Sequence, residues 1–97
     1  MTLGKLIENL DKLNEDLCIF ARKPWSSGSE ALVASLGPNF EVPDDISARG
    51  LAYFFSVHIA KQLLEVFDDR PASKNDRIRL LIYYGEHDAY PDWVFEE

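Results

Sequence analysis

The N-terminal part of the chain changes from a helical to a strand-like hydrophobic pattern. Up to Leu13 the apolar residues recur three and four positions apart, the spacing that lines one face of an α-helix. Thr2 precedes this pattern and is a suitable N-cap. From Leu17 to Arg22 apolar residues occupy both alternating sets instead. We therefore expect an amphipathic helix followed by a strand that is covered on both sides.

The following segment predicts a β-hairpin. Pro24–Ser29 consists mainly of proline, serine and glycine, which form turns, and residues 31–36 are apolar enough for a second strand. The connection is too short for a crossover helix, so the two strands should run antiparallel. Trp25 lies at the mouth of this hairpin. A role in covering the core is favoured over recognition of a partner, because a buried indole still donates a hydrogen bond to a loop carbonyl.

A short helix and a third strand are expected in the middle of the chain. Asp44 is a candidate N-cap for the helix, and Gly50 is a candidate stop. Leu51–Phe55 is rich in aromatic residues and has the composition of a strand. The pattern therefore places the third strand directly after the short helix.

Two longer helices are predicted in the last third. Ser56 can cap a helix that runs to about Asp68, and Arg70–Pro71 should end it because proline disfavours the α conformation in the residue before it. Ser73–Asp76 has the form of a capping box for a second helix that ends near Asp88 or Ala89. The apolar stripe of the first of these helices consists of Ile59, Leu63 and Phe67, widened by Val57, Ala60, Leu64 and Val66.

This order of elements predicts an α+β fold. We expect a small, mainly antiparallel three-stranded sheet covered by helices on one face, in the order α-β-β-(short α)-β-α-α. Residues 1–97 should form a single domain, with an acidic C-terminal tail from about residue 90 to 97.

Charge narrows the classes of partner. The 97 residues include 46% hydrophobic and 28% charged residues, which is typical of a globular domain and excludes disordered, collagen-like and membrane classes. Ten Lys and Arg against 17 Asp and Glu give a net charge of -7, so nucleic acid is not expected as a partner. A basic stretch, interpreted as neutralising part of the acidic end, comprises Arg70, Lys74, Arg77 and Arg79. The acidic end itself comprises Glu86, Asp88, Asp92, Glu96 and Glu97.

Two features of the sequence indicate the cellular compartment: its single cysteine and the short length of its apolar runs. Cys18 cannot form an internal disulfide, and the N-terminal residues lack the apolar region of a signal peptide. No apolar run approaches the roughly 20 residues of a membrane-spanning helix. We therefore expect a cytoplasmic protein without a membrane partner.

No catalytic or metal-binding motif stands out. His58 lies one and two helical turns before Gln62 and Glu65, but zinc needs three or four protein ligands and no further ligand has the right spacing. His87 is interpreted as a surface imidazole at a helix C-terminus, and Cys18 as a buried apolar filler. Catalytic residues, cofactors and metals are therefore all predicted to be absent.

Several segments together resemble a family of small bacterial proteins of unknown function. They are Ile19-Phe20-Ala21 with Pro24-Trp25, Ser29 before an apolar strand, Tyr53-Phe54 leading into Val57 and Ala60, and Ile82-Tyr83-Tyr84 with Asp88-Ala89. The resemblance implies a bacterial cytoplasmic domain. It implies no reaction, cofactor or catalytic residue.

The leading hypothesis is a non-enzymatic interaction or regulatory domain whose partner is a protein with a basic face. An immunity-type role, masking the cationic active site of a nuclease toxin, is one concrete form. Two alternatives stay open: a small enzyme or ligand-binding domain with a pocket near Trp25 and a histidine, and a structural homodimer joined through the third strand or the C-terminal aromatic residues. The candidate interaction residues are Trp25, Tyr84, Asp88, Tyr90, Asp92, Trp93 and Phe95.

Overall fold

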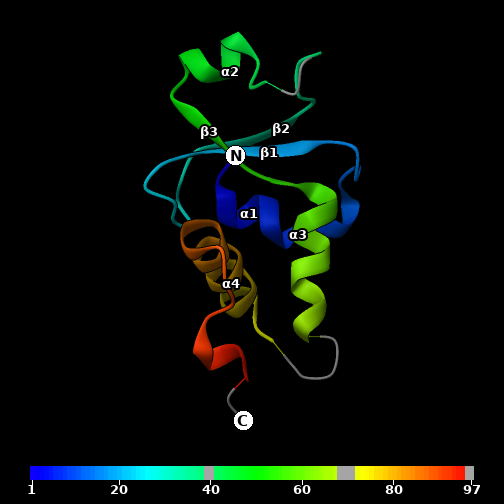
Figure 1. The fold of residues 1–97 in the computed structure, drawn as a ribbon, viewed down its shortest axis with the longest axis vertical. Coiled ribbons are helices and arrows are strands. Elements are labelled where there is room, and N and C mark those ends of the chain that lie inside the picture. The colour runs from blue at the N-terminus through cyan, green and yellow to red at the C-terminus, as the bar shows by residue number, and fades with distance from the viewer. Residues whose placement is uncertain (39–40, 68–71, 96–97) are drawn as a thin grey trace.

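The computed structural model describes residues 1–38, 41–67 and 72–95. It confirms the α+β class, with a three-stranded antiparallel sheet and the predicted order of the main elements (Figure 1). The elements are α1 (Leu3–Glu8), the 3-10 turn η1 (Leu10–Lys12), β1 (Cys18–Arg22), β2 (Ala31–Ala34), α2 (Asp44–Ala48), β3 (Leu51–Ser56), α3 (Val57–Leu64), η2 (Glu65–Phe67), α4 (Lys74–His87) and η3 (Asp92–Phe95).

The central strand is β1, which pairs with β2 on one side and with β3 on the other. Both pairings are antiparallel, as the short hairpin connection predicts. Leu17 accepts a 2.9 Å hydrogen bond from the backbone N–H of Val57, so the ladder continues to the point where β3 passes into α3. The sheet thereby fixes the start of α3 directly below the end of β3 (Figure 1).

Alternate residues of β1 point into two different cores. Ile19 and Ala21 belong to a main core, which α1, α3 and α4 cover, and both are fully buried. Phe20 lies on the opposite side in a smaller second core, which α2 covers through Ile46. The strand is therefore buried on both sides, as its sequence predicts. The expectation that helices cover only one face was wrong, because Phe20 and its neighbours need the short helix α2 as a cover on the other face.

The helices begin and end largely where the sequence indicates. The Thr2 hydroxyl accepts a 3.3 Å hydrogen bond from the Lys5 N–H, and the Ser56 hydroxyl accepts one of 3.1 Å from Ile59. Ser73 and Asp76 form the predicted capping box, with hydrogen bonds of 3.0 and 3.2 Å. Four of the orphan N–H groups at these helix starts are thus satisfied by nearby side chains.

Turn residues end two of the helices. Gly50 follows α2 with φ 78, a conformation that suits glycine and turns the chain into β3. Asp88 ends α4 in the left-handed conformation, within the predicted range for the end of that helix.

Three local expectations need correction. Asp44 is the first residue of α2 and not its N-cap, because Pro43 takes that position without a side-chain hydrogen bond. Ile59 is 40% exposed, since the buried face of α3 runs through Val57, Ala60 and Leu63 instead. The C-terminal segment, for which the sequence pattern predicts only an acidic tail from about residue 90, forms the turn η3. The predictions for Asp68-Asp69, Arg70-Pro71 and Glu96-Glu97 lie outside the described residues.

A β-bulge in β3 changes which core its aromatic rings enter. Ile19 pairs with Phe55 and Phe20 pairs with Tyr53, so Phe54 is an extra residue in the ladder. Phe54 and Phe55 consequently both pack against the main core, where strict alternation would place them on opposite faces. Tyr53 stays on the other side, with its ring edge on Phe20 at 6.1 Å.

Candidate functional site

Trp25 covers the end of the main core. Its indole N–H donates a 3.2 Å hydrogen bond to the Ala21 carbonyl, and its ring meets Phe54 edge-on at 4.8 Å. The Lys23 amine lies 4.8 Å from the centre of the indole ring. The covering role expected for this residue therefore matches its surroundings, and one face of its ring is already occupied by a cation.

Glycine in α4 makes room for this cover. A Cβ atom at Gly85 would lie 2.9 Å from the Trp25 ring and 3.0 Å from the Phe54 ring. These separations are shorter than ordinary carbon contacts, so a larger residue would push the indole outward. The close approach of α4 to the loop depends on glycine at this position.

Five aromatic rings form a continuous chain across the molecule. We call it the aromatic chain: Trp25, Phe54, Phe55, Tyr84 and Tyr90. Successive ring centres lie 4.8, 4.7, 6.1 and 5.1 Å apart. It joins three of the predicted interaction residues through two phenylalanines that sequence reasoning did not select. Periodicity could not have found this connection, because the bulge in β3 sets the direction of those two rings.

Trp93 belongs to a separate cluster. Its ring stacks on Phe67 with centres 6.2 Å apart, and the Arg79 guanidinium carbon lies 4.4 Å from its centre. The indole therefore has an aromatic and a cationic neighbour from within the chain. Val94 is 1% exposed and anchors η3 to the main core. Phe95 ends η3, and its side chain lies outside what the structure describes.

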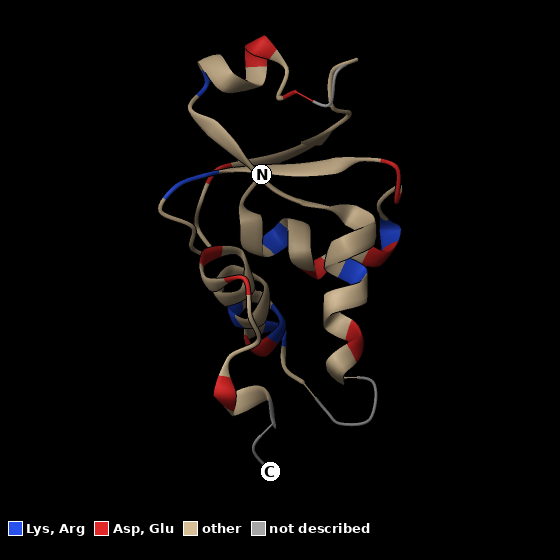
Figure 2. Ribbon diagram, in the orientation of Figure 1, with Lys and Arg blue, Asp and Glu red and all other residues tan. Residues whose placement is uncertain are grey.

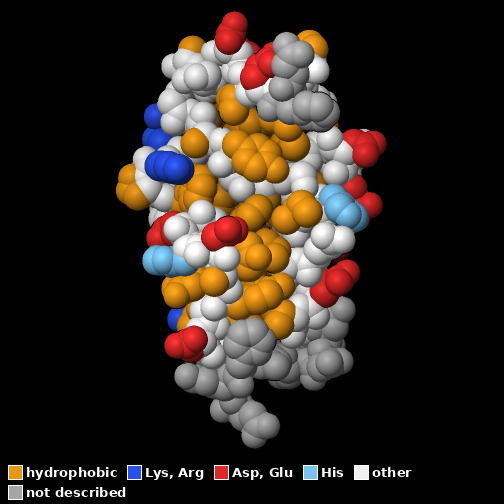
Figure 3. Space-filling view, in the orientation of Figure 1, with side chains coloured by type: hydrophobic (Ala, Val, Ile, Leu, Met, Phe, Trp, Pro, Cys, Tyr) orange, Lys and Arg blue, Asp and Glu red, His pale blue; other side chains and the backbone are white. Residues whose placement is uncertain are grey.

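Exposed apolar side chains border the aromatic chain. Tyr53, Ile59 and Tyr83 are 41%, 40% and 38% exposed, and they come from β3, α3 and α4. Figure 3 shows apolar side chains gathered in a band along the face that these elements present. We call the contacting rings Phe55, Tyr84 and Tyr90, together with the exposed Tyr83 next to Tyr84 in α4, the aromatic band.

Acidic side chains lie beside the apolar band in Figure 3, and Figure 2 marks the acidic positions along the ribbon. Burial first, then Tyr84, and then the Glu65 carboxylate raise the pKa of Tyr90, so a charge at the start of η2 acts on this ring. Asp88 and Asp92, two predicted interaction residues, are exposed on the segment that precedes and begins η3.

The described residues of the basic stretch form ion pairs with acidic residues other than those of the C-terminal end. Within the described residues, Lys74 pairs with Glu8 at 3.8 Å and Arg79 pairs with Asp76 at 3.8 Å. Both contacts involve acids from earlier in the chain or from the same helix. The described C-terminal carboxylates at 86, 88 and 92 are therefore not the observed partners of these bases.

His58 and His87 lie on different helices, α3 and α4, and each has its own neighbours. The His58 Nδ1 is 3.9 Å from a Glu15 carboxylate oxygen, whereas Glu65 was the carboxylate considered from the sequence. The His87 ring lies 4.2 Å from the Tyr83 ring on the exposed side of α4. No group of three or more His, Cys, Asp or Glu side chains in the described ranges could hold a metal ion.

Cys18 is a buried free thiol in the second core. Burial raises its pKa, which disfavours the thiolate needed for nucleophilic attack. Its position agrees with a packing role.

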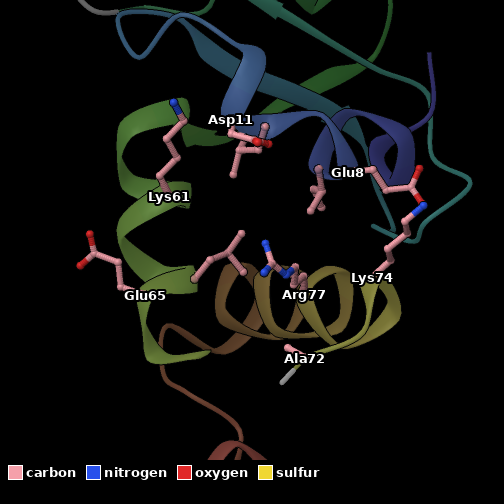
Figure 4. Close-up of a pocket in the computed structure, with 10 residues that line it drawn as sticks. Glu8, Asp11, Lys61, Glu65, Ala72, Lys74 and Arg77 are labelled. Carbon is pink, nitrogen blue, oxygen red and sulfur yellow. The ribbon is translucent and has the colours of Figure 1, made fainter. Parts of the chain in front are cut away.

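One pocket of about 540 Å³ lies between α1, η1, α3 and the start of α4 (Figure 4). It is lined by Ile7, Glu8, Leu10, Asp11, Lys61, Leu64, Glu65, Ala72, Lys74 and Arg77. Neither histidine nor Trp25 lines it, so this pocket differs from the one that the ligand-binding hypothesis placed near Trp25.

Comparison with known proteins adds no family. No family model matches the chain, and searches of curated proteins and of solved structures find no significant match. The resemblance to small bacterial proteins stays a prediction. In the described residues, no helix combines the length and apolar character needed to cross a membrane.

Proposed function

We propose that this protein is a non-enzymatic interaction domain of the bacterial cytoplasm that binds a protein with a basic face. The observation that carries the proposal is the aromatic band, on which tyrosines remain exposed between acidic margins. Tyrosine combines a large apolar surface with a polar group at low conformational cost, and it is enriched at the centres of protein interfaces. The net charge of -7 favours a cationic partner over an anionic one.

The exposed tyrosines are better candidates for contact with a partner than the two tryptophans. Trp25 and Trp93 each have a cation from the same chain over one ring face. Tyr53 and Tyr83 keep about two fifths of their surface exposed. The interaction surface proposed here therefore shifts from Trp25 and Trp93 toward Tyr83 and Tyr84, while Asp88 and Asp92 stay part of the proposal.

An immunity-type role would use the same surface. The band would cover apolar parts of the cationic site of a nuclease toxin, and the flanking carboxylates would meet its basic side chains in place of nucleic acid phosphates. A homodimer is less well supported by charge, because two copies would each bring seven net negative charges to the contact.

Affinity purification of the tagged protein from its native cells, followed by mass spectrometry, identifies a partner. Measurement of binding to that purified partner then tests the aromatic band as the interaction surface. Tyr83→Ala should weaken binding by about tenfold or more, whereas Tyr83→Phe retains most of the affinity. Asp88→Asn with Asp92→Asn should slow association and reduce its salt dependence. The matched control is Asp44→Asn with Asp45→Asn, on exposed residues of α2.

Two results would contradict the proposal. The first is a partner whose association rate and affinity are unchanged by both sets of substitutions in the band and its margin. The second is a stable dimer in light scattering at micromolar concentration that the Tyr83→Ala variant abolishes, which would establish self-association as the use of this surface.

A further inference from the structure

The pocket between α1, η1, α3 and α4 has a balanced set of charges over an apolar lining. Its volume of about 540 Å³ falls within the range of small-molecule sites. A simple anion such as phosphate would meet three carboxylates in it, and a simple cation would meet three bases. A wholly apolar ligand would remove some of these groups from water without replacing their hydrogen bonds. The charged lining residues are Glu8, Asp11, Glu65, Lys61, Lys74 and Arg77.

Most of these charges are already engaged or turned away. The Lys74 amine meets the Glu8 carboxylate at 3.8 Å along one edge of the pocket. The Lys61 amine lies 3.7 Å from the Glu15 carboxylate and donates to the Leu13 carbonyl at 3.5 Å, neither of which lines the pocket. The Glu65 carboxylate points away from the other labelled side chains (Figure 4).

Of the charged side chains that lack a described partner, Asp11 and Arg77 are the two that face this space (Figure 4). Within the described parts of the chain, neither side chain forms a hydrogen bond or an ion pair. Arg77 extends from α4 into the space bordered by α3 and η1, and Asp11 lies on the η1 side of that space (Figure 4). Ile7 and Leu10, each 3% exposed, line the same pocket as buried residues, and the half-buried Leu64 and Ala72 supply its accessible apolar surface.

We infer that this pocket binds a short peptide of apolar residues with free termini. The guanidinium of Arg77 matches the geometry of the terminal carboxylate, to which it can donate two parallel hydrogen bonds. The carboxylate of Asp11 would accept from the terminal ammonium group, and the apolar side chains would cover Leu64 and Ala72. This inference is independent of the proposed protein partner, because none of its residues belongs to the aromatic band.

Titration of the full chain with L-leucyl-L-leucine, followed by amide chemical shifts in ¹H–¹⁵N spectra, tests the site. We expect saturable shifts centred on Leu10, Asp11, Leu64 and Arg77. Arg77→Gln and Asp11→Asn should each weaken binding roughly ten- to hundredfold, the loss typical of one charge-assisted contact. Arg49→Gln and Asp45→Asn are matched controls on exposed positions around α2, and they should bind as the unmodified protein does.

The doubly blocked peptide N-acetyl-leucyl-leucinamide separates the zwitterion from its apolar side chains. Equal binding of the free and blocked peptides would overturn the inference, since the termini would then contribute nothing. The absence of saturable shifts up to the solubility of the free peptide would overturn it as well. Variants that retain a dispersed amide spectrum are folded, so a loss of binding in them reports on the pocket and not on stability.

Discussion

The main core and the second core share strand β1 but differ in what covers them. Three helices cover the main core, whereas the five-residue helix α2 covers the second. Ile19 and Phe20, on opposite sides of β1, are equally buried. The larger core also carries more aromatic surface than its helices enclose, and Phe55, Tyr84 and Tyr90 reach the protein surface from it. The candidate interaction surface is thus the outer part of the main core.

The largest expected effect compares one aliphatic side chain from each core. Leu81→Ala should destabilise the fold by about 2–5 kcal/mol, because the surrounding helices cannot close the resulting cavity. Ile46→Ala should fall toward the lower end of the same range, since α2 is short and can move toward the sheet. Urea unfolding followed by circular dichroism measures both. A larger loss for Ile46→Ala would show that the second core is the more rigidly packed one.

Crowding in the main core gives the next effect. Gly85→Ala should cost about 1 kcal/mol net, because an overpacking cost of about 1–3 kcal/mol exceeds the gain of about 1 kcal/mol in helix propensity. Displacement of the indole should also change tryptophan fluorescence. Gly28→Ala is the control, since a Cβ there meets no atom within 4 Å. A stabilised Gly85→Ala protein with unchanged fluorescence would contradict the tight contact with Trp25.

The two sides of the sheet also differ in how their helices begin. Ser73→Ala removes a capping box from α4 and should cost about 1 kcal/mol. Asp44→Ala, in the first turn of α2, should cost only a few tenths of a kcal/mol, because no side-chain hydrogen bond caps that helix. Thermal unfolding of both variants gives the comparison, and equal losses would mean that the capping box adds nothing beyond helix charge.

The smallest effect concerns pH and involves one tyrosine from each side. Burial is the main cause that raises the pKa of Tyr53 and of Tyr90 above 10.0 in the folded protein. The unfolded chain therefore loses these protons first, and stability present below pH 10.0 falls as pH rises through the folded pKa. Tyr53→Phe and Tyr90→Phe should each reduce this alkaline loss. Urea unfolding at neutral and alkaline pH tests it, and an unchanged pH dependence in both variants would refute it.

Local sequence signals predicted most of the fold. Caps at Thr2, Ser56 and Ser73 depend on hydrogen bonds to residues three positions away, so their pattern is visible in the chain itself. The double-sided burial of β1 was readable because both of its alternating sets are apolar. The cover of its second face by α2 was not, because that contact joins residues distant in sequence.

The candidate site was only partly predictable. Tyr84 and Tyr90 were selected as aromatic residues near acids, but their link to Trp25 passes through Phe54 and Phe55. Composition also could not distinguish exposed tyrosines from tryptophans whose ring faces are occupied by Lys23 and Arg79. Such differences arise from tertiary contacts and not from local spacing.

The extra residue in β3 makes the length of that strand a constraint on the main core. With Phe54 deleted, the ladder could regain regular alternation, with Phe55 still opposite Ile19 and facing the main core. The aromatic chain, which connects the hairpin loop to the end of α4, would then lose the ring that joins Trp25 to Phe55. The deletion of one residue at this point would therefore remove a ring from the main core and leave the second core its own residues, so the bulge supplies aromatic contact to one side of the sheet only.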